Sequence, residues 1–169
     1  RLPAVLHRYR AMKLNLGAAD RALPGFIGVD IVPPADQIAD LRLRWPWLDS
    51  SVDEIAAYDI FEHIVCQCCP DGRIHVLNES WRVLRPGGRV TIEVPSASKG
   101  AGFAQDPTHK TAWCMNSFQY FEDGSFAHKR LSKSYCIRAR FRIISLAERE
   151  YQDVHEPAWK ITAVLEAVK

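Results

Sequence analysis

The stretch KLNLGAADRALPGFIGVDI, residues 13–31, contains two short apolar runs separated by a loop of small residues. Apolar runs of this length, bounded by turn residues, are typical of buried strands. Because the side chains of Gly17, Ala18 and Ala19 are no larger than a methyl group, a ligand can approach this loop closely. Asp30 ends the second run, where a carboxylate can accept hydrogen bonds from both ribose hydroxyls. The pattern indicates a nucleotide-binding strand, loop and strand, or else a tight turn between two core strands.

The loop departs from the dinucleotide-binding fingerprint. It lacks a G-x-G-x-x-G sequence, and Pro24 and Gly25 occupy the place of a crossover helix. A pyrophosphate binds at a helix N-terminus, which so short a connection does not supply. These features disfavour a nicotinamide or nucleotide-sugar enzyme.

The bulk composition narrows the class of protein. A chain of 169 residues fits one domain, residues 1–169, and its 22 Lys+Arg against 20 Asp+Glu give a net charge of only +2. This balance argues against a nucleic-acid partner. No apolar run approaches the roughly 18 residues of a membrane span, and no signal pattern is visible. We expect a cytoplasmic protein with no nucleic-acid or membrane partner, in which the five cysteines are reduced thiols.

The segment HIVCQCCPDGRIH gathers side chains that zinc binds, namely His63, Cys66, Cys68, Cys69 and His75. No second pair of ligands follows it downstream, as zinc-binding modules usually require. The prediction is therefore no metal site, and the role of the cysteine cluster stays open.

The remainder of the chain alternates strands and helices. Residues 52–60 and 89–95 are predicted strands, and residues 73–85 a helix capped by Asp71 and ended by a Pro-Gly-Gly turn. Its apolar stripe is Ile74, Leu77, Trp81 and Leu84. Residues 135–150 and 158–168 form a terminal hairpin with one buried and one wet face. This order predicts an α/β fold with a mostly parallel sheet and an antiparallel edge.

Residues 96–128 lack a periodic pattern and are predicted to form a loop or lid on the substrate side of the domain. Four aromatic residues lie in this segment. We expect them to form a small core beneath the loop in preference to the wall of an acceptor pocket: Trp113, Phe118, Tyr120 and Phe121.

Five segments, taken in order, resemble the class I S-adenosylmethionine-dependent methyltransferases. They are KLNLGAADRALPGFIGVD, DLRLRWPWLDSSVDEI, FEHI, WRVLRPGGRVTIEVP and DPTH, and they span residues 12–121. The resemblance is to small bacterial and phage-type, methyltransferase type 11-like members with a shortened first crossover. It implies a single Rossmann-like domain with a seven-stranded, mostly parallel sheet and an antiparallel C-terminal edge. It also implies S-adenosyl-L-methionine as cofactor.

The implied acceptor is a small molecule or a glycan, methylated on oxygen or nitrogen. No Asn-Pro-Pro-Tyr-like tetrapeptide follows residues 52–60, and in this class such a tetrapeptide marks methylation of nucleic-acid bases or glutamine. The alternative is a non-catalytic protein of the same fold that binds the cofactor or a partner.

The resemblance also implies roles for individual residues. The methionine and ribose portions of the cofactor would lie on Leu16, Gly17 and Ala18, with Ala57 and Tyr58 at the methionine end. Asp30 would bind the ribose hydroxyls. The adenine would contact Ile31, Asp40 and Leu41.

Asp106 and His109 would face the substrate, and the candidate general bases are His109, His63 and Asp59. One departure concerns Ala19, which stands where the family has a second Gly. An alanine there is well accommodated only at negative φ, because positive φ costs an L-residue about 1 kcal/mol or more.

Overall fold

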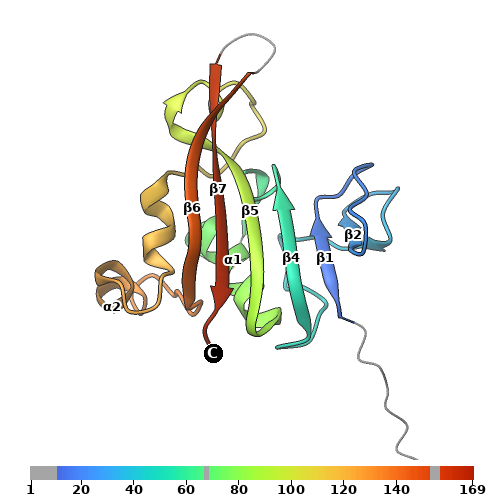
Figure 1. The fold of residues 1–169 in the computed structure, drawn as a ribbon, viewed down its shortest axis with the longest axis horizontal. Helices are drawn as coiled ribbons and strands as arrows, with labels where there is room; N and C mark the ends of the chain where they lie inside the picture. The colour runs from blue at the N-terminus through green and yellow to red at the C-terminus, as the bar shows by residue number, and fades with distance from the viewer. Residues whose placement is uncertain (1–10, 67–68, 153–156) are drawn as a thin grey trace, which may run out of the picture.

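The computed structural model describes residues 11–66, 69–152 and 157–169, and these form one seven-stranded sheet of order β3-β2-β1-β4-β5-β7-β6 (Figure 1). The strands from β3 to β5 pair in parallel, and β7 is antiparallel to both β5 and β6. The predicted mixed sheet with an antiparallel C-terminal edge is confirmed. The strands are β1 (Lys13–Leu16), β2 (Ile27–Asp30), β3 (Gln37–Ile38), β4 (Val52–Tyr58), β5 (Leu84–Gly100), β6 (Phe141–Gln152) and β7 (Pro157–Ala167).

The predicted helix is α1 (Gly72–Val83), and Asp71 caps it by accepting a hydrogen bond from the Arg73 N–H at 2.7 Å. The helix ends at Val83, and β5 begins at the next residue, Leu84, whose backbone is extended. The Pro-Gly-Gly turn predicted to end the helix therefore lies within β5. Shorter helical segments are η1 (Phe61–His63), η2 (Met115–Tyr120) and α2 (Phe126–Leu131). No helix in the described segments is long and apolar enough to cross a membrane.

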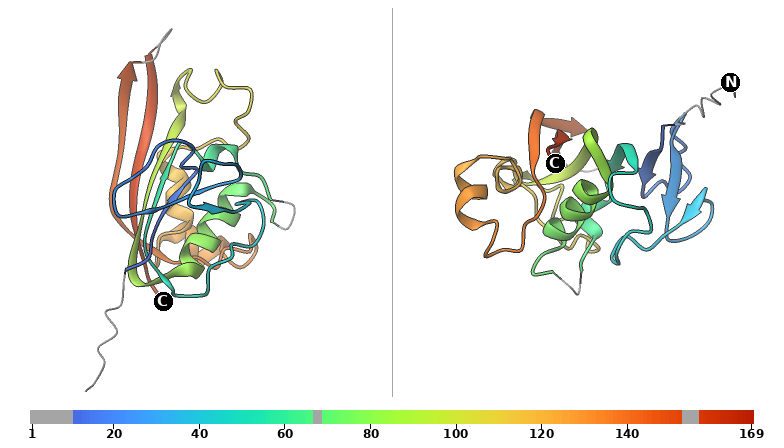
Figure 2. Two further views of the ribbon diagram at one scale, coloured as in Figure 1. Left: turned by 90° about the vertical axis from the view of Figure 1, so that its right-hand side faces the viewer. Right: turned by 90° about the horizontal axis from the view of Figure 1, so that it is seen from below.

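The helices lie on one face of the sheet, as the edge-on view in Figure 2 shows. Strand residues facing this layer are fully buried, among them Val90, Ile92 and Val94 of β5. The residues that alternate with them, such as Arg89, Thr91 and Glu93, point the other way and remain accessible to water. The period of two along the strand thus separates a dry face from a wet face.

The wet face carries a row of charges that crosses five strands. The strand registers align Lys13, Glu54, Arg89, Glu166 and Arg142 on β1, β4, β5, β7 and β6. Lys13 Nζ lies 2.6 Å from Glu54 Oε2, Arg89 Nη2 lies 3.0 Å from Glu166 Oε2, and Arg142 pairs with the other oxygen of Glu166. Parallel sheets are usually covered on both faces, whereas these charges let one face remain in water.

The aromatic residues of the 96–128 segment form the predicted small core. Trp113, Phe118 and Phe121 are buried, and the Trp113 ring lies 5.3 Å from that of Phe118 and 6.5 Å from that of Phe61. Tyr120 is only partly buried and lines a separate cavity of about 680 Å³ beside α1. The first residues of this segment, up to Gly100, extend β5.

The strand predicted over residues 135–150 begins only at Phe141. Before it, Ile137 and Ala139 are buried as the alternation predicts, but their segment packs against α1 instead of pairing in the sheet. Asn78 of α1 holds this segment, because its Oδ1 accepts the N–H groups of Arg138 and Ala139 at 2.8 and 2.9 Å. The backbone groups therefore have a helix side chain as partner where a strand neighbour was expected.

Candidate active site at the carboxyl ends of the parallel strands

Gly17 directly follows β1 and packs against Ile60, a residue that follows β4. Its φ is +66°, and a Cβ atom built on it would lie 2.6 Å from Cγ1 of Ile60. A side chain at this position would therefore meet both backbone strain and a steric clash. The contact brings the loops after β1 and β4 together.

Asp30 ties the loop after β1 to the end of β2. Its Oδ2 accepts the Ala19 N–H at 2.9 Å, and its Oδ1 accepts the Ile31 N–H at 2.7 Å. Oδ1 also accepts the Val32 N–H at 3.4 Å. A carboxylate oxygen can accept two hydrogen bonds, so Oδ2 retains one for a ribose hydroxyl. Ala19 adopts φ +44°, so the strained conformation, and not the favourable negative φ, is the one present.

Asp40 and Leu41 follow β3. Both oxygens of Asp40 accept hydrogen bonds from the Arg42 guanidinium, at 2.9 and 2.8 Å, and this pairing lowers the pKa of Asp40. An adenine amine would share this carboxylate with Arg42. Leu41 is buried, and its carbonyl oxygen lies 3.0 Å from Nε2 of His75 on α1.

The residues predicted to bind the cofactor all lie at the carboxyl ends of four adjacent strands, β3, β2, β1 and β4. Tyr58 lines a cavity of about 120 Å³ together with Gly17, Ala18 and Arg21. Ala57 is fully buried between Leu16 of β1 and Ile92 of β5. The set brought to this edge is Leu16, Gly17, Ala18, Asp30, Ile31, Asp40, Leu41, Ala57 and Tyr58.

The donors and acceptors at this edge fit a nucleoside with an adenine and two ribose hydroxyls. The cavity is too small to hold such a ligand, since small-molecule pockets span roughly 300–1,000 Å³ and this one measures about 120 Å³. Ile60 packs against Gly17, and residues 21–23 line the cavity. Binding of S-adenosylmethionine therefore requires these two elements to move apart.

Asp59, a predicted base, forms an ion pair with Lys160, a residue that no sequence motif indicates. Lys160 Nζ of β7 lies 2.7 Å from Asp59 Oδ2 and 3.0 Å from Glu93 Oε1. Burial alone would lower the pKa of Lys160, but these two carboxylates outweigh it and raise the pKa. Because Oδ2 of Asp59 is already occupied by the Lys160 ammonium, Asp59 is the least available of the three candidates.

Glu62 is a buried acid next to the predicted histidines. It is 1% exposed, and its Oε2 has no hydrogen-bond partner in the part of the chain that the structure describes. Burial raises its pKa to about 8. Its position inside the FEHI segment, between an apolar residue and His63, was the available sequence signal.

His109 lies against this acid. Its Nε2 is 3.9 Å from Glu62 Oε1 and 3.7 Å from Asp106 Oδ2, and its ring centroid is 4.8 Å from that of His63. Its Nδ1 lies 2.8 Å from the carbonyl oxygen of Phe103. Because a carbonyl only accepts, Nδ1 carries the hydrogen, and Nε2 of the neutral ring is the basic atom.

A second chain of hydrogen bonds orients His63. Its Nδ1 lies 3.1 Å from the hydroxyl oxygen of Thr108, which donates to Asp106 Oδ1 at 2.6 Å. This bond and the backbone bond from the Thr108 N–H lower the pKa of Asp106. The predicted substrate-side residues Asp106 and His109 and the predicted base His63 thus form one cluster with Glu62, whereas Asp59 belongs to the lysine pair.

The three-dimensional fold is shared with methyltransferases of known structure. No family model matches the sequence, and no curated relative was found. An S-adenosylmethionine-dependent methyltransferase from Archaeoglobus fulgidus is 13% identical, with a TM-score of 0.61 over 92% of this chain and 86% of that one. One from Methanosarcina mazei is 16% identical, with a TM-score of 0.58 over 99% and 98%.

A Haloferax volcanii protein solved in complex with the Trm112 methyltransferase activator is 15% identical, with a TM-score of 0.59 over 95% of this chain and 84% of that structure. At these identities the likeness establishes the fold, which is that of the class I S-adenosylmethionine-dependent methyltransferases.

Proposed function

We propose that this chain transfers a methyl group from S-adenosylmethionine to an oxygen or nitrogen of a small-molecule or glycan-type acceptor. The observation that carries the proposal is the position of Glu62, His63 and His109 relative to Gly17. Ile60 packs on Gly17 at the cofactor edge, and η1, which carries Glu62 and His63, begins at the next residue. A proton-accepting cluster therefore adjoins the edge at which the cofactor would bind.

The strand ends supply the cofactor contacts. Asp30 would accept the ribose hydroxyls, Asp40 the adenine amine, and the backbone at Gly17 would face the methionine portion. S-adenosylmethionine, when bound, supplies an electrophilic methyl group. The chain contributes alignment of the acceptor with that methyl group and exclusion of water, which are the main requirements of an in-line displacement.

His109 is the residue best placed to accept the proton of the acceptor. Its basic Nε2 faces the cluster, and the nearby Asp106 carboxylate stabilises the positive charge that the ring acquires. Neutral Glu62 keeps a second negative charge away from the ring in the resting state. The Phe103 ring, 5.7 Å from that of His109, and the carbonyl oxygen of Phe103 fix the plane of the imidazole.

The nature of the acceptor is supported by charge. Lys+Arg and Asp+Glu nearly balance, at 22 and 20, and a nucleic-acid substrate is usually met by a basic face. We therefore favour a small molecule or a glycan in the cytoplasm as acceptor.

Calorimetry with S-adenosylmethionine and S-adenosylhomocysteine tests the cofactor half of the proposal. We expect micromolar binding, weakened at least about 10-fold by Asp30→Ala and less by Asp30→Asn, which keeps one acceptor for the loop N–H groups. No heat and no thermal shift at millimolar cofactor would overturn the proposal. Transfer is then measured as S-adenosylhomocysteine release with a panel of sugars, phenols and amines.

The alternative is a non-catalytic protein of the same fold that binds the cofactor or a partner. The small cavity and the strained Ala19 favour it. Cofactor binding without transfer to any acceptor in the panel, unchanged by His109→Asn, would support this alternative over the enzyme.

A further inference from the structure

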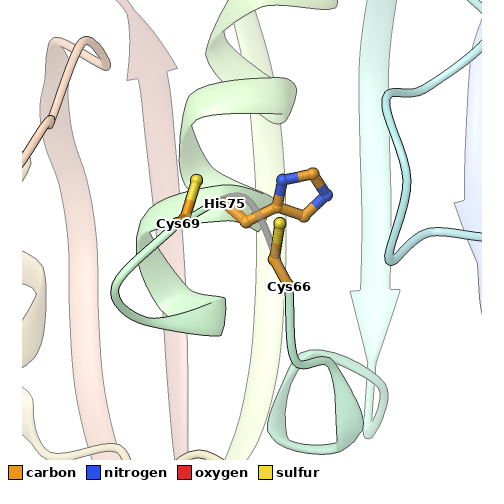
Figure 3. Close-up of side chains that lie close together, drawn as sticks. All are labelled: Cys66, Cys69 and His75. Carbon is orange, nitrogen blue, oxygen red and sulfur yellow. The ribbon is translucent and has the colours of Figure 1, made fainter.

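We infer that Cys66, Cys69 and His75 form a zinc site. The two Sγ atoms and one imidazole nitrogen lie within 4.8 Å of one another. Figure 3 shows the three side chains gathered at the first turn of α1, with Cys66 arriving from the segment after η1 and Cys69 from the residues just before the helix.

The spacing of the cysteines suits a metal. Cys66 and Cys69 are separated by two residues, the C-x-x-C spacing of zinc-binding pairs, and the prediction of no metal site wrongly took this pair to be lacking. The third ligand comes from α1 and not from a second pair downstream. Two thiolates and an imidazole are the donors that zinc prefers, whereas magnesium and calcium require oxygen ligands.

His75 is already held in the orientation that a metal ligand needs. Its Nε2 lies 3.0 Å from the carbonyl oxygen of Leu41 and 3.1 Å from that of Leu43. Carbonyls accept only, so Nε2 carries the hydrogen and Nδ1 presents its lone pair. An imidazole that donates one N–H to a backbone carbonyl and binds metal through its other nitrogen is the usual arrangement at zinc sites.

The distances require only a small contraction. Ligand atoms about 2.3 Å from a tetrahedral zinc stand roughly 3.7 Å apart, so the three atoms close by at most about 1 Å from their present separation. Cys66 and Cys69 are both partly accessible and lie on loop residues, which can make this movement, while buried His75 stays fixed on its helix.

The fourth coordination position is open to water. Cys69 and His75 line a cavity of about 330 Å³. Asp49 and Glu79 line it as well, but Arg82 holds both carboxylates, at 2.7 and 2.6 Å. The described residues thus provide three ligands, and the cavity admits a water molecule as the fourth.

The site would link the metal to the active-site edge. His75 contacts the carbonyl of Leu41, beside Asp40, and Cys66 follows His63 by only three residues. Zinc would therefore fix both the loop after β3 and the segment after η1. This consequence rests on the proposed function, whereas the zinc site itself does not.

Elemental analysis of the protein purified under reducing conditions without chelator tests the site. We expect about one zinc per chain, reduced to near zero in Cys66→Ser and in Cys69→Ser. Cys136→Ser, which removes an exposed thiol elsewhere, is the matched control and should retain the zinc. Zinc at full occupancy in both ligand variants would overturn the inference.

Cobalt substitution keeps the test independent of whether a variant folds. Adding Co²⁺ to the metal-free wild-type protein should give the thiolate-to-cobalt charge-transfer band and the intense visible bands of a tetrahedral site. An octahedral, weakly coloured spectrum, or a disulfide between Cys66 and Cys69 in the purified protein, would exclude the site. Cofactor calorimetry on zinc-loaded and metal-free protein then measures the link separately, because loss of cofactor binding leaves the zinc count unchanged.

Discussion

The imidazole Nε2 of His109 lies 3.9 Å from the carboxyl Oε1 of Glu62, an acid that is 1% exposed. The two residues are 47 positions apart in the sequence. A buried acid with a raised pKa beside a histidine is an arrangement that recurs where enzymes move protons, and it gives the site properties that can be measured.

Replacing His109 with Asn should abolish most methyl transfer without harming the fold. The Asn amide can still donate to the carbonyl of Phe103, but it lacks the basic atom that Nε2 provides. We expect kcat to fall about 10²–10⁴-fold, as for loss of a general base, with the cofactor Kd changed less than about 3-fold. Steady-state kinetics and calorimetry check this expectation, with His128→Asn as control. Full activity in His109→Asn would assign proton removal to another group.

Glu62→Gln should change how stability depends on pH. Burial raises the folded-state pKa of Glu62 from 4.5 to about 8, so between these values the folded state holds a proton that the unfolded state has lost. The wild-type free energy of unfolding therefore falls as pH rises from about 4.5 to about 8, and the variant lacks this fall. Over a window of about 3.5 pH units, at about 1.4 kcal/mol per unit, the difference should approach a magnitude on the order of 5 kcal/mol above pH 8.

Urea unfolding at a series of pH values measures this difference. Glu54→Gln, on the wet face with a side chain 39% exposed, is the control and should shift stability by no more than about 1 kcal/mol. Parallel curves for the wild type and Glu62→Gln across the whole range would contradict the raised pKa.

Ala19 has a φ of +44°. The effect of a substitution there on the free energy of unfolding should therefore depend mainly on how well the new residue tolerates positive φ. Gly relieves the strain but loses conformational entropy, and we expect Ala19→Gly to alter the unfolding free energy by less than about 1 kcal/mol. Ala19→Val should destabilise by about 2 kcal/mol, since a β-branched residue disfavours positive φ. Tighter cofactor binding in Ala19→Gly, measured by calorimetry, would show that the methyl group crowds the site; equal affinity would show that it does not.

Gly17→Ala should be destabilising for two separable reasons. Its φ of +66° strains any side chain, and the new Cβ would meet Ile60 at 2.6 Å. We expect a loss of about 3 kcal/mol in the free energy of unfolding. In a double-mutant cycle with Ile60→Ala the steric part should disappear and leave about 1–2 kcal/mol. Strict additivity of the two substitutions would mean that Ile60 does not press on Gly17.

Much of the fold could be predicted because its signals are local. The alternation of Arg138, Arg140 and Arg142 with apolar residues marks the approach to the terminal hairpin, and Asp71 marks the start of α1. The residues at the strand ends follow from chain order, because parallel strands bring their carboxyl ends to one edge.

The rest depends on contacts between distant parts of the chain. Lys160 reaches Asp59 across 101 positions, and no local pattern announces that pairing. Glu62 lies against His109, which is 47 positions later in the sequence, and the residues around position 62 do not indicate this contact. Ala19 has a positive φ and donates its N–H to Asp30, 11 positions later in the chain. Residues 17–19 alone therefore do not predict this conformation.

The row of charges from Lys13 to Arg142 bears on the use of this chain as a scaffold. In the described part of the chain the helices cover one side of the sheet, and the opposite side carries this row of charges. Labels, affinity tags or a solid support attached through residues of that side would stand behind the sheet, away from both the strand ends and the helical layer. Attachment through this side is suited to immobilised assays of the acceptor panel.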